Sequence, residues 1–176
     1  VTQLTDGGFL VTWISADGAS QGNGLFGQRY TSAGVAVGSE FRLNTTTLGE
    51  QGAVASGDRA HDVVGLVGGG WVATWYDGAK DGSSGGIYYQ IYDTNGQKLG
   101  AETRVNKTTT DEQRYPTITA LADGGFAIAW ESNLQDSANY GVYQKVYEAN
   151  GLERLTRPTT DILVNTAVAS DQLVPK

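Results

Sequence analysis

A period-2 pattern of side chains runs along three stretches that each end in tryptophan. The three stretches are GGFLVTW, GGWVATW and GGFAIAW, which begin with a glycine pair and end at Trp13, Trp75 and Trp130. Bulky residues occupy every second position, which is the spacing that places side chains on one face of a strand. An aromatic-rich stretch follows in each case and ends seventeen residues after the tryptophan, at Tyr30, Tyr92 and Tyr147. No window shows convincing helical periodicity, so the pattern predicts an all-β protein.

Further residues recur in step with these strands. An asparagine closes FRLN, TRVN and ILVN, and a glutamine follows seven residues later, giving the pairs Asn44–Gln51, Asn106–Gln113 and Asn165–Gln172. The chain is therefore predicted to be a single repeat domain of three units, at about 1–57, 58–115 and 116–176. A first strand is divided between the two ends of the chain, so the opposite terminus completes it. DQLVPK and VTQL are the two pieces of that strand. About seven additional residues interrupt the first unit.

Each unit reads as four strands joined by glycine-rich turns, which is typical of β-propeller blades. A threefold β-prism, with one sheet per unit, is the alternative. Three blades are fewer than the roughly 4 to 8 that close a propeller ring. We therefore expect either a homodimer that completes a six-bladed ring or further repeats of a longer parent chain.

Composition narrows the classes of partner. The chain has 176 residues and a net charge of −7, which disfavours nucleic acid because phosphates require a basic surface. No stretch approaches the roughly 18 apolar residues of a membrane-inserted helix. Cysteine is absent, which excludes disulfides and thiolate metal sites.

Three segments resemble a repeat of very large secreted bacterial proteins. LADGGFAIAW, QDSANYGVYQKVYEANG and GSEFRLNTTTLGEQ are similar to repeats of RTX-type (hemolysin-type calcium-binding) exoproteins and adhesins. The resemblance covers almost the whole chain and implies an extracellular location with a surface, adhesive or accessory role. The calcium-binding nonapeptide GGxGxDxUx of RTX β-rolls is absent. Calcium ligands therefore cannot be transferred residue by residue.

Catalytic chemistry has little support in the sequence. The single histidine, His61, is expected in the loop formed by the additional residues, and no GxSxG motif is present. The repeated acids Glu50, Glu112 and Asp171 occur one per unit, which favours a structural role over an acid–base pair. No catalytic residue is assigned. The predicted function is a non-enzymatic extracellular scaffold or adhesion module. A carbohydrate-binding, lectin-like module is the alternative, and a polysaccharide-active enzyme ranks third.

The loops that follow the three tryptophans are the predicted binding sites. They are equal in length and should share one rim of the assembly, where loops on a rigid scaffold commonly bind ligands. Asp77, Asp81, Asp136 and Asn139 offer oxygen atoms suited to glycans or calcium. Asp81 and Asp136 both stand six residues after a tryptophan, whereas the first unit has Ala19 there. We therefore predict calcium as a cofactor at one or two loops, with Asp81 and Asp136 as metal ligands.

Overall fold

The computed structural model describes residues 1–16, 22–54, 57–135, 139–154, 160–166, 171–173 and 175. Over these residues the chain forms strands and turns without a helix, which confirms the all-β prediction. It follows that no helix there is long and apolar enough to cross a membrane. The strands are β1 (Thr2–Gln3), β2 (Phe9–Ala16), β3 (Asn23–Tyr30), β4 (Ala36–Arg42), β5 (His61–Gly65), β6 (Trp71–Asp77), β7 (Gly86–Tyr92), β8 (Lys98–Arg104), β9 (Gln113–Ala120), β10 (Phe126–Asn133), β11 (Tyr140–Tyr147) and β12 (Ile162–Leu163).

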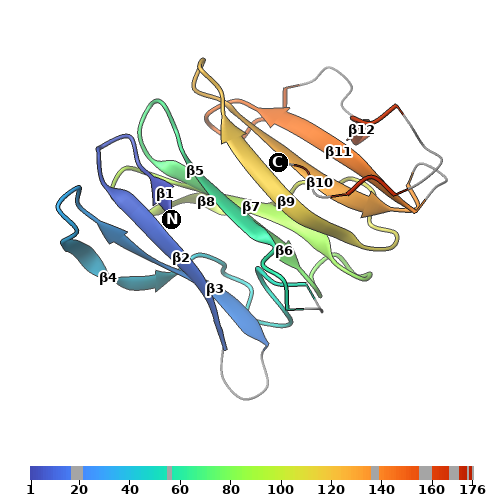
Figure 1. The fold of residues 1–176 in the computed structure, drawn as a ribbon, viewed down its shortest axis with the longest axis horizontal. Helices are drawn as coiled ribbons and strands as arrows, with labels where there is room; N and C mark the ends of the chain where they lie inside the picture. Colours follow the sequence, from blue (N-terminus) through green and yellow to red (C-terminus); the bar gives the residue numbers. More distant parts are fainter. Residues whose placement is uncertain are drawn as a thin grey trace.

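These strands form three antiparallel sheets of four strands each, and every sheet follows the order of the chain (Figure 1). Sheet 1 contains β1 to β4, sheet 2 contains β5 to β8, and sheet 3 contains β9 to β12. The three tandem four-stranded units predicted from the repeat are thus confirmed. The first strands differ in length, because β1 has 2 residues whereas β9 has 8.

Glycine at a fixed position shapes the turn between the third and fourth strands. Gly34, Gly96 and Gly151 have φ angles of 79°, 83° and 84°, a region that side-chain-bearing residues adopt at a cost. In the first copy the amide of Gly34 donates to the carbonyl of Thr31 at 2.9 Å. The repeated TSAG, DTNG and EANG segments therefore encode one tight turn.

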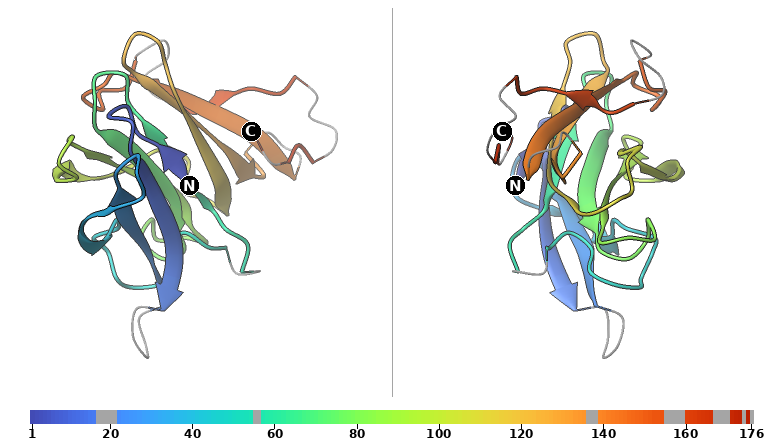
Figure 2. Two further views of the ribbon diagram at one scale, coloured as in Figure 1. Left: turned by 60° about the vertical axis from the view of Figure 1, so that its left-hand side comes forward. Right: turned by 90° about the vertical axis from the view of Figure 1, so that its right-hand side faces the viewer.

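The sheets stack face to face, with sheet 2 between sheets 1 and 3 (Figures 1 and 2). We call the face that carries the tryptophans the leading face of a sheet, and the opposite face its trailing face. The leading face of sheet 2 packs on the trailing face of sheet 1 through a cluster that includes Trp71, Trp75, Leu10, Leu25 and Leu43. The leading face of sheet 3 packs on the trailing face of sheet 2 through Phe126, Trp130, Val72, Ile87 and Val105. This is the arrangement of propeller-like blades.

The structure corrects the expectation that His61 lies in a loop. His61 begins β5 and pairs with Trp75 of β6. Its Nε2 lies 3.3 Å from the hydroxyl of Thr12, and its Nδ1 lies 3.3 Å from the carbonyl oxygen of Gly52. Burial lowers the pKa of this imidazole. The repeat alignment placed His61 among the additional residues because sequence spacing alone did not show where the first strand of the second unit begins.

Candidate functional site: rim loops and end faces

Each sheet contains the same side-chain brace, made by the repeated asparagine and glutamine. In sheet 2 the side-chain oxygen of Asn106 accepts a hydrogen bond from the amide of Ile87 at 2.8 Å, and its nitrogen donates to Gln113 at 3.0 Å. The corresponding contacts join Asn44 with Leu25 and Gln51, and Asn165 with Val142 and Gln172. The brace ties the third strand to the segment after the fourth. These repeated polar residues are therefore engaged in holding backbone.

A second repeated contact is a hydrogen bond in sheets 1 and 2 and an ion pair in sheet 3. Gln28 and Gln90 donate to carbonyl oxygens of the bulged fourth strand, at 3.2 Å to Val37 and 3.0 Å to Leu99. Lys145 occupies the equivalent position in β11 and lies 3.4 Å from the carboxylate of Asp161, with both side chains buried. Burial lowers the pKa of Lys145, opposed by the nearby carboxylates.

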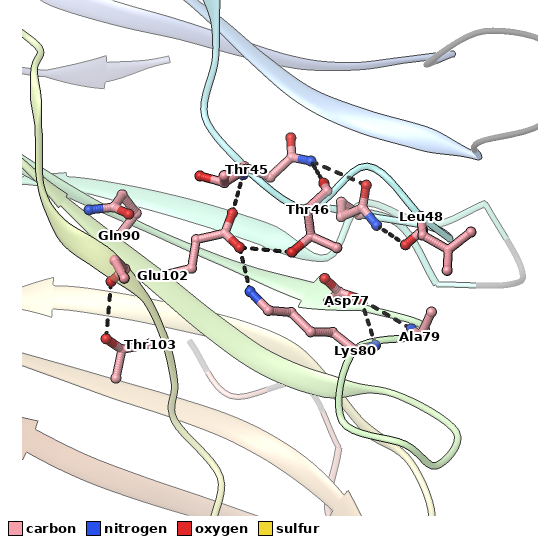
Figure 3. Close-up of polar contacts among 12 residues, drawn as sticks. Thr45, Thr46, Leu48, Asp77, Ala79, Lys80, Gln90, Glu102 and Thr103 are labelled. Carbon is pink, nitrogen blue, oxygen red and sulfur yellow. Dashed lines mark hydrogen bonds and ion pairs between the residues drawn. The ribbon is translucent and has the colours of Figure 1, made fainter.

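Asp77, a predicted ligand residue, is the last residue of β6 and is buried rather than displayed on the rim. Its Oδ1 accepts hydrogen bonds from the amides of Ala79 and Lys80, at 3.1 and 3.0 Å (Figure 3). Its Oδ2 is buried and has no hydrogen-bond partner. Burial raises the pKa of this carboxyl, opposed by the two amides and by Lys80.

The other predicted ligands differ in their surroundings. Asp81 lies in the loop after β6, where its Oδ1 accepts a hydrogen bond from the amide of Ser83 at 3.0 Å. Its Oδ2 is buried without a hydrogen-bond partner. Asn139 is exposed, just before β11. Asp136 falls outside the described residues. Within the described ranges, no group of three or more His, Cys, Asp or Glu side chains is placed to hold a metal.

A polar cluster that the sequence did not predict joins sheets 1 and 2 beside the loop that follows β6. Glu102 of β8 accepts hydrogen bonds from Lys80, from the amide of Thr45 and from the hydroxyl of Thr46 (Figure 3). Burial alone would raise the pKa of Glu102, but these donors lower it overall. The equivalent residue in the first unit, Glu40, is exposed. Nothing in the local sequence separates the two glutamates, because the difference depends on which sheets meet.

The leading face of sheet 1 is aromatic, and none of the sheets formed by the described residues covers it. Phe9 stacks on Tyr30 with ring centroids 5.1 Å apart, as Phe126 stacks on Tyr147 at 5.0 Å. The second pair is buried beneath sheet 2, whereas Phe9 and Tyr30 are only partly buried. Trp13 is likewise only partly buried, although the equivalent Trp75 and Trp130 are fully buried. We call this surface the leading end face. Its residues, all partly buried, are Phe9, Val11, Trp13, Phe26 and Tyr30.

The trailing face of sheet 3 likewise has no covering sheet among the described residues. Val164 is 52% exposed, whereas the equivalent Leu43 and Val105 are 0% and 1% exposed beneath the next sheet. A surface cavity of about 550 Å³ lies on this face. We call this the trailing end face, and its cavity is lined in part by Thr117, Thr119, Ala127, Ala129, Gln144 and Val164.

Two comparisons of the sequence with known proteins were negative. A scan against models of protein families finds no match for this chain. A search of curated protein sequences likewise finds none.

Proposed function

We propose that this chain is a non-catalytic scaffold module whose two end faces dock onto further sheets of the same repeat. One observation carries the proposal. The positions that are buried where sheets 1, 2 and 3 meet are the positions left uncovered at the two ends of the stack. A leading face fits a trailing face twice within the chain, so the free leading face of one copy is complementary to the free trailing face of another.

The occupant of each end face is a sheet of this same type, supplied by a second copy of the chain. The contact is heterologous, since two different faces meet, and such contacts close into rings when the rotation permits. Two copies bring six sheets together, within the roughly 4 to 8 blades of known rings. An apolar surface of this kind on a sheet otherwise favours aggregation.

Sedimentation velocity tests this proposal. We expect the chain to sediment at twice its mass of 18.6 kDa. Ala129→Lys places a charge at the centre of the trailing end face and should give the single-chain mass. Val67→Lys, at an exposed residue in the β5–β6 turn, is the matched control and should leave the dimer intact. A wild-type chain that stays at 18.6 kDa at its highest soluble concentration contradicts the proposal.

The setting of the scaffold is also part of the proposal. An extracellular location and an adhesive role rest on the resemblance of the repeats to those of secreted bacterial proteins. The engagement of the repeated Asn and Gln residues in backbone braces supports a structural role over a catalytic one. Release of reducing ends from a polysaccharide by the purified chain, lost in His61→Ala, would favour the enzymatic alternative.

Calcium remains a proposed cofactor of the loop after β6. Asp77 and Asp81 each have a buried carboxylate oxygen without a hydrogen-bond partner, and Ca²⁺ prefers such oxygen ligands. A ligand that binds only the folded state raises the melting temperature. We expect a higher melting temperature in millimolar calcium than in EDTA, and a smaller difference in Asp81→Asn. Equal melting curves would remove calcium from the proposal.

A further inference from the structure

A groove with a positive lining runs between sheets 1 and 2. It lies between β4 and the turn that joins β7 to β8, and its volume is about 540 Å³. Arg29, Arg42 and Lys98 line it, together with the ring of Phe41. Arg29 and Lys98 thus bring two cations to one groove of a chain whose net charge is −7, whereas the guanidinium group of Arg42 lies over the ring of Phe26. Pockets of roughly 300–1,000 Å³ accommodate small ligands.

The repeat does not require this groove to be positive. At the junction of sheets 2 and 3, Ile91 stands at the position of Arg29 and Glu153 at that of Lys98. Ile91 is buried in the core there, and Glu153 lies 3.6 Å from Lys145. Two sheets of this repeat can therefore stack with an apolar residue and an acid at these two positions. Arg29 and Lys98 are therefore particular to the first junction and are not required for two such sheets to stack.

Lys98 and Arg29 are each incompletely paired in the groove. The ammonium group of Lys98 donates to the hydroxyl of Thr45 at 2.8 Å, and no carboxylate of the described residues forms an ion pair with it. Burial lowers the pKa of Lys98, as do the neighbouring Arg42 and Lys80, while Glu102 opposes them. Arg29 pairs with Asp6 at 3.2 Å, but its Nε is buried without a hydrogen-bond partner. Lys98 is exposed, so an anion in the groove can form a charge-assisted contact with its ammonium group and with the guanidinium group of Arg29.

The remaining lining suits a ring with hydroxyl groups. Phe41 is partly buried, with its ring centroid 5.9 Å from that of Trp71, so its position is fixed by the core. Asn95 and Gln97 are exposed on the opposite wall and carry amide groups that donate and accept hydrogen bonds. Aromatic faces pack against the apolar face of sugar rings, and amides bind hydroxyls.

We propose that this groove binds an acidic saccharide, with Arg29 and Lys98 on the anionic group, Phe41 beneath the sugar ring, and Asn95 and Gln97 on hydroxyls. The anionic group is a carboxylate or a sulfate, which the same cations recognise. Both walls belong to one chain. The proposal therefore stands or fails independently of docking between copies.

Isothermal titration calorimetry on the full chain tests the proposal with four probes. These are an oligogalacturonide, a sulfated galactan oligosaccharide, a neutral galactan oligosaccharide and sodium sulfate. We expect at least one acidic oligosaccharide to bind, with an affinity that falls as salt is added. The tighter of the two identifies the anionic group. Binding of the neutral oligosaccharide or of sulfate alone at equal affinity would overturn the proposal, as would no binding of either acidic probe at millimolar concentration.

Substitution at Lys98 locates the site. Lys98→Gln should weaken binding of the acidic oligosaccharide about tenfold or more, because a charge-assisted contact is lost. Lys98→Glu introduces the acid found at the equivalent position of the second junction and should abolish binding. Lys107→Gln is the matched control, since Lys107 is an exposed lysine at that second junction. Unchanged affinity in Lys98→Gln, with a normal circular dichroism spectrum, would place the site elsewhere and overturn the assignment.

Discussion

Asn106 illustrates how a single repeated residue can hold a unit together. It is fully buried and links the amide of Ile87 to the side chain of Gln113. Asn106→Ala leaves both groups buried without a partner, at about 1–3 kcal/mol for each. We expect a loss of about 3 kcal/mol in the free energy of unfolding, measured by urea denaturation. Asn165→Ala is the control at the same position of sheet 3, where water can reach the brace, and it should cost less. Equal losses would contradict the role of burial.

Asp77 gives a second prediction at the residue scale. A carboxyl whose pKa is raised on folding contributes most to stability below its unfolded pKa, and that contribution is lost as pH rises through the folded value. In EDTA, Asp77→Asn should therefore raise the melting temperature at pH 7, and the gain should vanish below about pH 4. Asp93→Asn, in an exposed turn with similar backbone hydrogen bonds, is the control and should change little. A gain that does not depend on pH would contradict the burial of an unfavourable charge.

At the scale of the element, strand alternation predicted β2, β6 and β10 because each carries its own period-2 pattern. Burial of Trp75 and Trp130 follows from that pattern. Contacts between sheets were not predictable, since they join residues far apart in the chain. The repeat alignment accordingly placed His61 in a loop, and the glutamate cluster around Glu102 had no local signal. The burial of Asp77 was missed because sequence alone does not show that β6 extends two residues beyond its tryptophan.

The third sheet offers an element-scale prediction. Lys145 and Asp161 form a buried ion pair that holds the segment 161–163 against β11. Lys145→Gln restores the residue found in sheets 1 and 2 but leaves Asp161 as a buried carboxylate without its cation. We expect a loss of about 3–5 kcal/mol in the free energy of unfolding. The double variant Lys145→Gln, Asp161→Asn removes both charges and should recover much of that loss. A single variant as stable as the wild type would show that the pair does not bind this segment.

At the scale of the whole molecule, three sheets stack through one type of interface and leave its two halves free at opposite ends. The proposed docking of one copy onto another would repeat this type of interface. A heterologous contact differs from a symmetric one in a testable way, since each contact uses the leading face of one copy and the trailing face of the other.

A mixing experiment tests this most directly. Val11→Lys disables the leading end face, and Ala129→Lys disables the trailing end face. Each variant alone should sediment at 18.6 kDa, because every contact between its copies requires the damaged face. An equimolar mixture retains one intact pair of faces and should form a heterodimer of twice that mass. A mixture that stays at the single-chain mass, or a single variant that still dimerises, would contradict head-to-tail docking of the repeats.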